Sequence, residues 1–167
     1  MTATIPQMFL HLTKSYPKPD LMLYKKEGRY VPISTEEFRT RVIRSALGLQ
    51  GWGVGPGDKV IILAENGPNW TIADYAVLSL GGITVPAYTS LVPEQIKYII
   101  NDSDARAVII SGPELWEKVE AIRKDLPLVK HFITLEPQAR EGLMTLAQLQ
   151  EQGEKAEAQN PGLFEKL

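Results

Sequence analysis

A strand, helix and strand over residues 57–88 restrict the possible folds of this chain more than any other feature of its sequence. Val60 to Ala64 is a short apolar run with β-branched residues, and its length is typical of a buried strand. Pro68 suits the first turn of a helix, and Gly81-Gly82 end that helix. Ile83 to Val85 is a second β-branched run. Since a right-handed crossover of about 30 residues joins parallel strands in this way, the segment predicts a parallel sheet.

The alternation of short apolar runs with helical patterns continues beyond this segment. Further strands are predicted at Ala107 to Ile110 and at His131 to Leu135, and further helices begin at Pro93 and Pro113. Strands that alternate with helices at this spacing predict an α/β fold, with a mostly parallel sheet and helices on both faces.

The first part of the chain predicts a smaller, separate feature. Leu21 to Tyr24 and Arg29 to Ile33 are two extended runs joined by a short turn, and they predict a small N-terminal hairpin. Thr4 is expected to cap a short amphipathic helix. Ser34 is expected to cap the next helix and to form a capping box with Glu37.

The last part of the chain is expected to be less well ordered than the rest. We assign residues 1–135 to an N-terminal α/β subdomain and residues 136–167 to a helical, partly disordered tail. Leu143 and Leu149 lie on the face of one further predicted helix. Residues 152–160 are polar and contain no large apolar residue, so this stretch is expected to be poorly ordered.

Composition excludes several functional classes. The net charge is −2 and no run of Lys and Arg occurs, so no nucleic-acid partner is expected. Cysteine is absent, which excludes a disulfide scaffold and a thiol nucleophile and is compatible with a reducing cytoplasm. Pro6 and His11 interrupt any apolar leader, and no run approaches the length of a membrane span. We expect a cytoplasmic chain without an integral membrane segment, and peripheral contact with a membrane is left open.

The familiar nucleotide and hydrolase motifs are missing. The glycines at 51, 53, 55 and 57 precede a strand, whereas a dinucleotide-binding fingerprint must follow one, so we interpret them as a helix stop and a loop. No phosphate-binding loop with its lysine occurs, and no nucleophile elbow surrounds Ser79.

The charged and aromatic residues that attract attention have ordinary structural explanations. His11 and His131 have no neighbouring ligands at metal spacing, and capping of a helix end explains Asp102 and Asp104 better than calcium does. Glu65, at the carboxyl end of the first strand, is the most suggestive acid, because ligands gather beyond strand ends in open α/β sheets. Capping of the next helix is the preferred explanation.

Trp70 and Tyr75 are expected in the core or at an interface between lobes rather than in contact with a substrate. From the residues alone we assign no catalytic, cofactor-binding or metal-binding residue.

Four short motifs resemble the N-terminal part of the AMP-forming acyl-CoA synthetases, which belong to the adenylate-forming superfamily. They are Gly57-Asp58-Lys59-Val60, Glu65-Asn66-x-Pro68-x-Trp70, Gly81-Gly82-x-x-Val85-Pro86 and Pro93-Glu94-Gln95-x-x-Tyr98-Ile99. The resemblance is strongest to bacterial long-chain fatty acid–CoA ligases, on the basis of Tyr30-Val31-Pro32-Ile33-Ser34 and Asn160-Pro161-Gly162-Leu163-Phe164. One departure is Val92, where the family usually has Thr or Ser to cap a helix.

The resemblance implies a two-step ligase that first forms an acyl-adenylate from ATP and then an acyl-CoA. It implies ATP, magnesium and coenzyme A as cofactors of the full-length enzyme, and none for this chain. The family's catalytic motifs lie after the region covered here, and the tail leads toward its phosphate loop. The chain is therefore expected to be a scaffold, inactive alone, whose partners are a fatty acid substrate and the missing C-terminal parts of the same enzyme. Self-association or a homodimer is left open.

Two other hypotheses compete with this one. A truncated family member could act alone as a binding or interaction module. A lobe of a nicotinamide-dependent oxidoreductase would share the alternating α/β pattern, but the absence of the glycine fingerprint argues against it.

Overall fold

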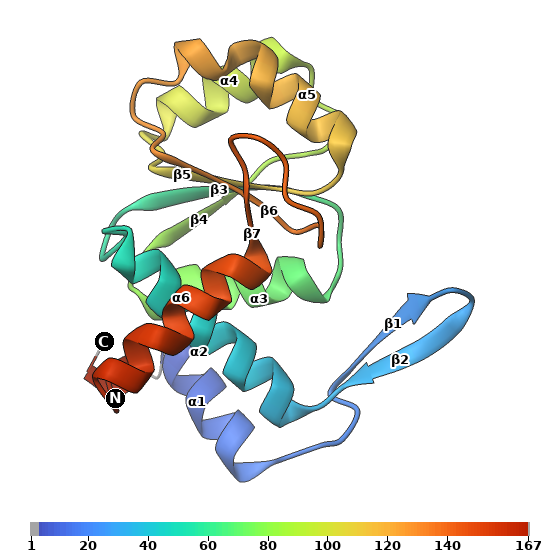
Figure 1. Ribbon diagram of the computed structural model, residues 1–167, viewed down its shortest axis with the longest axis vertical. Helices are drawn as coiled ribbons and strands as arrows, with labels where there is room; N and C mark the ends of the chain where they lie inside the picture. Colours follow the sequence, from blue (N-terminus) through green and yellow to red (C-terminus); the bar gives the residue numbers. More distant parts are fainter. Residues whose placement is uncertain (1–3, 167) are drawn as a thin grey trace.

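The computed structural model describes residues 4–166 and shows a three-layer α/β structure with a hairpin that extends from one end (Figure 1). The central layer is a sheet of five parallel strands in the order β4-β3-β5-β6-β7. Their bounds are β3 (Lys59–Leu63), β4 (Ile83–Pro86), β5 (Ala107–Ile110), β6 (His131–Thr134) and β7 (Met144–Thr145). The predicted α/β class with a parallel sheet is confirmed.

Helices cover both faces of the sheet (Figure 1). One face packs on α4 (Pro93–Asp102) and α5 (Pro113–Ile122), and the other packs on α3 (Pro68–Ser79), α2 (Thr35–Gly51) and α6 (Leu146–Gln159). Each face has its own apolar cluster, and successive residues of β3 point to opposite faces. Ile61 therefore packs in the cluster under α4 and α5, and Ile62 packs in the cluster under α2, α3 and α6. Because both faces are buried, the strand is apolar throughout rather than alternating.

The strand order reverses at β3. The chain passes from β3 outward to β4 and then crosses back to β5 on the other side of β3. This arrangement places a topological switch point between the carboxyl ends of β3 and β5, where open α/β sheets bind their ligands. β4 is left as an edge strand, and Pro86 at its end has no N–H to donate to a further strand.

The hairpin consists of β1 (Met22–Lys26) and β2 (Arg29–Ile33), as predicted. Its two-residue turn has positive φ at both Glu27 (50°) and Gly28 (79°), as a type I′ turn requires. One face of the hairpin packs with α1 (Ile5–Ser15) on a third apolar cluster, whose buried members are Phe9, Ile33, Phe38, Val42 and Ile72.

The helix caps are formed largely as predicted. Thr4 Oγ1 accepts a hydrogen bond from the Gln7 N–H, and Ser34 Oγ accepts one from the Glu37 N–H at 3.1 Å. The capping box predicted at Ser34 is only half formed, because the Glu37 carboxylate pairs with Arg41 one turn further on.

The tail differs from the prediction. Residues 152–159 are helical, since α6 continues to Gln159, and a 3₁₀ turn follows at η2 (Phe164–Lys166). The other 3₁₀ turn, η1 (Arg123–Asp125), lies before the tail and directly after α5. The prediction of a poorly ordered stretch there is wrong because α6 packs along α2 through glycines, which a count of large apolar residues does not register. β7, with two residues, also escaped prediction.

None of the helices between residues 4 and 166 is long and apolar enough to cross a membrane.

Candidate functional site

The carboxyl edge of the sheet gathers polar groups from three successive loops. At the switch point, Ser111 Oγ, just after β5, accepts a hydrogen bond of 2.8 Å from the Glu65 N–H, just after β3. The Ser111 N–H donates in turn to the Leu63 carbonyl at 3.3 Å. The two loops that flank the switch point are therefore joined directly, and their relative position is fixed.

Glu136, in the loop after β6, continues this edge. Its Oε1 accepts a hydrogen bond of 3.0 Å from the Gly112 N–H, and its own N–H donates to Thr134 Oγ1 at 3.1 Å. Gly112 is the N-cap residue of α5 and has a φ of 70°. The carboxylate thus occupies the amino end of a helix, where negative charge is favourable.

A hollow of about 370 Å³ lies between the inner face of the hairpin and this edge. The hairpin contributes Tyr24 and Ile33. The polar and aromatic groups on the other side are Arg41, Glu65, Asn69, Trp70, Ser111 and Glu136. Two neighbouring hollows of about 410 and 460 Å³ share Glu65.

Glu65 does not cap the helix that follows it. The N-cap of α3 is Gly67, and no side chain within residues 4–166 makes a capping hydrogen bond there. The preferred explanation of Glu65 as a cap is therefore wrong. Its side chain is exposed and borders all three hollows, because the residue stands at the end of the central strand of the switch point.

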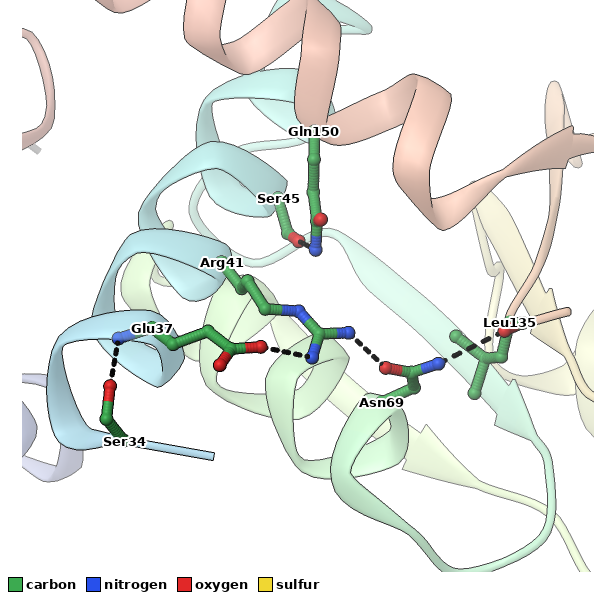
Figure 2. A network of polar contacts seen from close by, with 7 residues as sticks. All are labelled: Ser34, Glu37, Arg41, Ser45, Asn69, Leu135 and Gln150. Carbon is green, nitrogen blue, oxygen red and sulfur yellow. Dashed lines mark hydrogen bonds and ion pairs between the residues drawn. The ribbon is translucent and has the colours of Figure 1, made fainter. Parts of the chain in front are cut away.

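A relay of polar side chains connects the helical layer to this edge, as Figure 2 shows. Arg41 on α2 pairs with Glu37 (3.5 Å) and donates a hydrogen bond to Asn69 Oδ1 at the start of α3. Asn69 Nδ2 then donates to the Leu135 carbonyl at 3.1 Å, just beyond β6. The relay fixes α2 and α3 to the carboxyl end of the sheet and forms one wall of the hollow.

Lys118 on α5 holds the loop that follows β4. Its Nζ donates to the carbonyl oxygens of Thr89 (2.9 Å) and Leu91 (3.0 Å), so α5 is anchored to the loop between β4 and α4. Glu65 and Glu136 give the rim of the hollows two carboxylates, and Arg41 and Lys118 are both engaged in the contacts just described.

A family model described as "AMP-binding enzyme" matches residues 12–162 of this chain. The chain belongs to the AMP-binding enzyme family. The resemblance stated from the short motifs is confirmed by this match.

Curated relatives of this chain are long-chain fatty acid–CoA ligases. A ligase of Thermus thermophilus is 36% identical over 108 residues, which are 65% of this chain and 20% of that protein. One from Mycobacterium tuberculosis is 27% identical over 119 residues, or 70% of this chain and 20% of the relative. A bovine ligase is 28% identical over 153 residues, which are 90% of this chain and 21% of that protein. The chain thus spans about a fifth of the length of the relatives that it matches.

Solved structures share the fold of this chain. A putative long-chain fatty acid–CoA ligase of Rhodopseudomonas palustris aligns with a TM-score of 0.76 at 22% identity, over 88% of this chain and 36% of that one. The anthranilate–CoA ligase AuaEII, crystallised with anthranoyl-AMP, aligns with a TM-score of 0.74 at 23% identity, over 86% and 27%.

Most aromatic and charged residues singled out in the sequence have structural roles. Tyr75 packs against Phe9 (centroid distance 5.2 Å) and Phe38 (5.7 Å), and Trp70 is half buried against the core beside the hollow. Asp102 ends α4, and Asp104 follows with a φ of 54°. Within residues 4–166, no group of three or more His, Cys, Asp and Glu side chains is placed to hold a metal ion.

His131 lies at the opposite, amino end of β6 and stacks on Trp52, with ring centroids 4.3 Å apart. Partial burial lowers the pKa of His131, and the positive charge of Lys130 acts in the same direction, whereas a hydrogen bond with the Trp52 backbone opposes them. The predicted role as a strand residue is confirmed. His11 lies exposed on α1.

Sequence reasoning missed Ser111, Glu136 and Lys118. Ser111 and Glu136 each follow a predicted strand and Lys118 lies on α5, but only the strand order of the sheet brings all three beside Glu65. The relay from Arg41 to Asn69 carries no local signal, because its members are 28 positions apart.

Proposed function

We propose that this chain is the N-terminal part of an ATP-dependent, AMP-forming fatty acid–CoA ligase. The match to the AMP-binding enzyme family over residues 12–162 carries this proposal, and the names of the curated relatives supply the substrate class. In such a reaction the fatty acid carboxylate attacks the α-phosphate of ATP and expels pyrophosphate. The thiol of coenzyme A then attacks the acyl carbonyl and expels AMP.

The groups on the carboxyl edge suit a supporting role better than nucleotide binding. Glu65 and Glu136 place negative charge where a triphosphate would need cations, and Lys118 is engaged by two backbone carbonyls. We therefore assign ATP, magnesium and coenzyme A to parts of the ligase outside this chain. The chain's own contribution is a rigid wall, because Ser111 and the Arg41–Asn69 relay fix the loops that line it.

No residue of the chain is assigned to the chemistry. Glu65 is exposed and borders all three hollows, and it is proposed as a contact to the remainder of the enzyme.

A second surface also suits the remainder of the enzyme. β4 has an unpaired edge, and large apolar side chains stand exposed on and after it: Ile83, Tyr88 (81% exposed), Val92 and Tyr98. Isolated single-domain proteins rarely leave such surfaces open. The lone chain is expected to self-associate in sedimentation velocity and to bind a hydrophobic dye. A monomer peak with negligible dye binding would contradict this part of the proposal.

The test of the ligase proposal compares two lengths of chain. Residues 1–167 are assayed for fatty-acid-dependent exchange of pyrophosphate into ATP, and so is the longer product of the same reading frame if it extends past Leu167. Exchange by the longer product alone supports the proposal. Exchange by residues 1–167 would refute the scaffold role, and no exchange by the longer product with any fatty acid would refute the ligase assignment.

Calorimetry on residues 1–167 distinguishes the scaffold role from the alternative, in which the chain is a self-contained binding module. Heat of binding to a fatty acid in the absence of any further chain favours that alternative, whereas no binding favours the scaffold.

We place the enzyme in the cytoplasm, with which the absence of cysteine from this chain is compatible.

A further inference from the structure

A further hollow, of about 380 Å³, lies at the amino end of β6 and beside β7, the edge strand opposite to β4. Its walls come from the end of α2, η1, the start of β6 and the segment that runs through β7 into α6. None of its lining residues borders the hollows at the carboxyl edge. We call it the amino-end hollow, defined by Trp52, Arg123, Lys130, His131, Phe132 and Gln148.

The ionisable side chains of this hollow are all basic. Arg123, Lys130 and His131 line it, and no Asp or Glu within residues 4–166 does. Burial lowers the pKa of His131, and the charge of Lys130 acts in the same direction. A hydrogen bond with the Trp52 backbone opposes them, and no carboxylate in the described part of the chain does so. The hollow is therefore electrostatically complementary to an anion.

The guanidinium of Arg123 is held in place before any ligand arrives. It lies over the ring of Phe132, 5.0 Å from the centroid, and against Gly142, where a Cβ atom would collide with it. Its ion pair with Glu120 is 3.6 Å long and joins two side chains that are both 40% or more exposed. Because such exposed pairs contribute little free energy, the guanidinium remains available to a ligand.

Gln148 supplies a neutral donor beside these cations. Its Oε1 accepts hydrogen bonds from the Thr145 N–H (2.9 Å) and from the Thr145 hydroxyl (3.2 Å), so the NH₂ group of the same amide takes no part in the capping box. Phe132 and Leu143, both buried, and the half-buried Trp52 add apolar surface. The hollow thus combines donors for an anion with room for a small apolar group.

We propose that the amino-end hollow binds a small phosphate monoester. A phosphate group presents three acceptor oxygens. The Arg123 guanidinium can bind two of them at once, and the Lys130 ammonium and the Gln148 amide can bind the third. A carboxylate has only two oxygens and would leave a donor without an acceptor. The volume and the apolar lining favour an ester over inorganic phosphate.

The first test is a titration of residues 1–167 with phenyl phosphate at neutral pH and constant ionic strength, followed by proton NMR. The chain has two histidines, so His131→Gln assigns their ring resonances. The resonances of His131 are expected to move and to saturate, and those of His11, exposed on α1, are expected to stay in place. Equal movement of both, or movement of neither, would overturn the proposal.

Inorganic phosphate and benzyl alcohol separate the two halves of the ligand. Phenyl phosphate is expected to bind about tenfold or more tightly than either, because the first lacks an apolar group and the second lacks charge. Equally tight binding of benzyl alcohol would make the hollow an apolar pocket. Equally tight binding of inorganic phosphate would remove the part assigned to the ester. Either result contradicts the proposal.

Lys130→Gln and Arg123→Lys locate the site. Each is expected to weaken the binding of phenyl phosphate by about tenfold, since each removes a charge-assisted hydrogen bond. Lys130 is exposed, so its replacement leaves the core intact. The matched control is Lys124→Gln, which removes the same charge at an exposed position that does not line the hollow. Equal weakening in the control would show attraction by net charge alone and would refute the assignment.

The longer product of the same reading frame, if the frame extends past Leu167, is titrated in the same way. Movement of the His131 resonances there supports a ligand site that stays open in the whole protein. No movement would show that the remainder of the protein covers the hollow, and the proposal would fail. Because the pyrophosphate exchange assay contains no phenyl phosphate, failure here leaves the ligase proposal untouched.

Discussion

Gly153 in α6 lies so close to the backbone of Arg44 in α2 that a Cβ atom at position 153 would overlap the Arg44 carbonyl group. Gly48 on α2 meets the backbone of Leu149 in the same close manner. Around this crossing, Arg44 pairs with Glu154, and Gln150 Nε2 donates to Ser45 Oγ at 3.0 Å. The two helices therefore pack through two glycines flanked by polar contacts.

We predict that Gly153→Ala lowers the free energy of unfolding by roughly 1–3 kcal/mol or more, since overpacking forces the two helices apart. Urea unfolding measures the change. Gly51→Ala is the matched control, because Gly51 ends the same α2 helix and, among the described residues, no atom beyond its chain neighbours and the backbone of its own helix turn lies within 4 Å of the added Cβ. That control is expected to gain roughly 0.5–1 kcal/mol from helix propensity.

The contact between α2 and α6 also shows what the sequence could and could not predict. The parallel sheet, both helical layers and the hairpin follow from local periodicity, because β-branched runs such as Val60 to Leu63 have few alternative structures. The end of α6 does not follow from local periodicity, since a glycine in a helix interior lowers the local helix propensity. Only the close contact with α2 explains why Gly153 stands there. β7 is too short to give a periodic signal.

The candidate site was less predictable than the fold. Glu65 could be recognised by its place after a strand, but its neighbours Ser111 and Glu136 depend on strand order, which no local pattern specifies. The prediction that Glu65 caps α3 is wrong because the helix begins at Pro68 with Gly67 as its N-cap and without a side-chain cap.

The relay from α2 to the sheet gives a second prediction. Asn69→Ala removes the acceptor for Arg41 and the donor for the Leu135 carbonyl, and unsatisfied half-buried groups of this kind cost about 1–3 kcal/mol. Urea unfolding of Asn69→Ala, Arg41→Ala and the double variant measures it. The double variant is expected to lose less than the sum of the two single losses, since the partners act together. Additive losses would show that the two residues stabilise the fold independently.

A third prediction concerns Val92, the N-cap of α4. Its backbone has the extended conformation of a cap, and Gln95 Oε1 accepts a hydrogen bond from the Val92 N–H at 3.3 Å, but valine cannot accept one in return. Val92→Thr would complete the capping box, and we expect it to raise the free energy of unfolding by about 1 kcal/mol. Val92→Ala tests the mechanism, because it changes the side chain without adding an acceptor and should bring no gain.

A fourth prediction concerns pH. The pKa of His131 is lowered in the folded chain, chiefly by burial, so the unfolded chain takes up a proton first as the pH falls. The neutral side chain of His131 contributes to the free energy of unfolding, and this contribution is fully present above the ordinary histidine pKa of about 6.5. It is lost as the pH falls from there through the lower pKa of His131 in the folded chain. Urea unfolding at a series of pH values should show this loss, and His131→Gln should remove that part of the pH dependence. An unchanged curve in the variant would assign the effect to another group.

The pairing of Arg44 with Glu154 joins positions 110 residues apart in the chain. During synthesis, the side of α2 that receives α6 emerges from the ribosome long before its cover has been translated. Contacts of such long range form late in folding, and uncovered apolar surface at that stage invites association with other nascent chains. The arrival of α6 therefore sets the moment at which this side of α2 is protected from neighbouring chains.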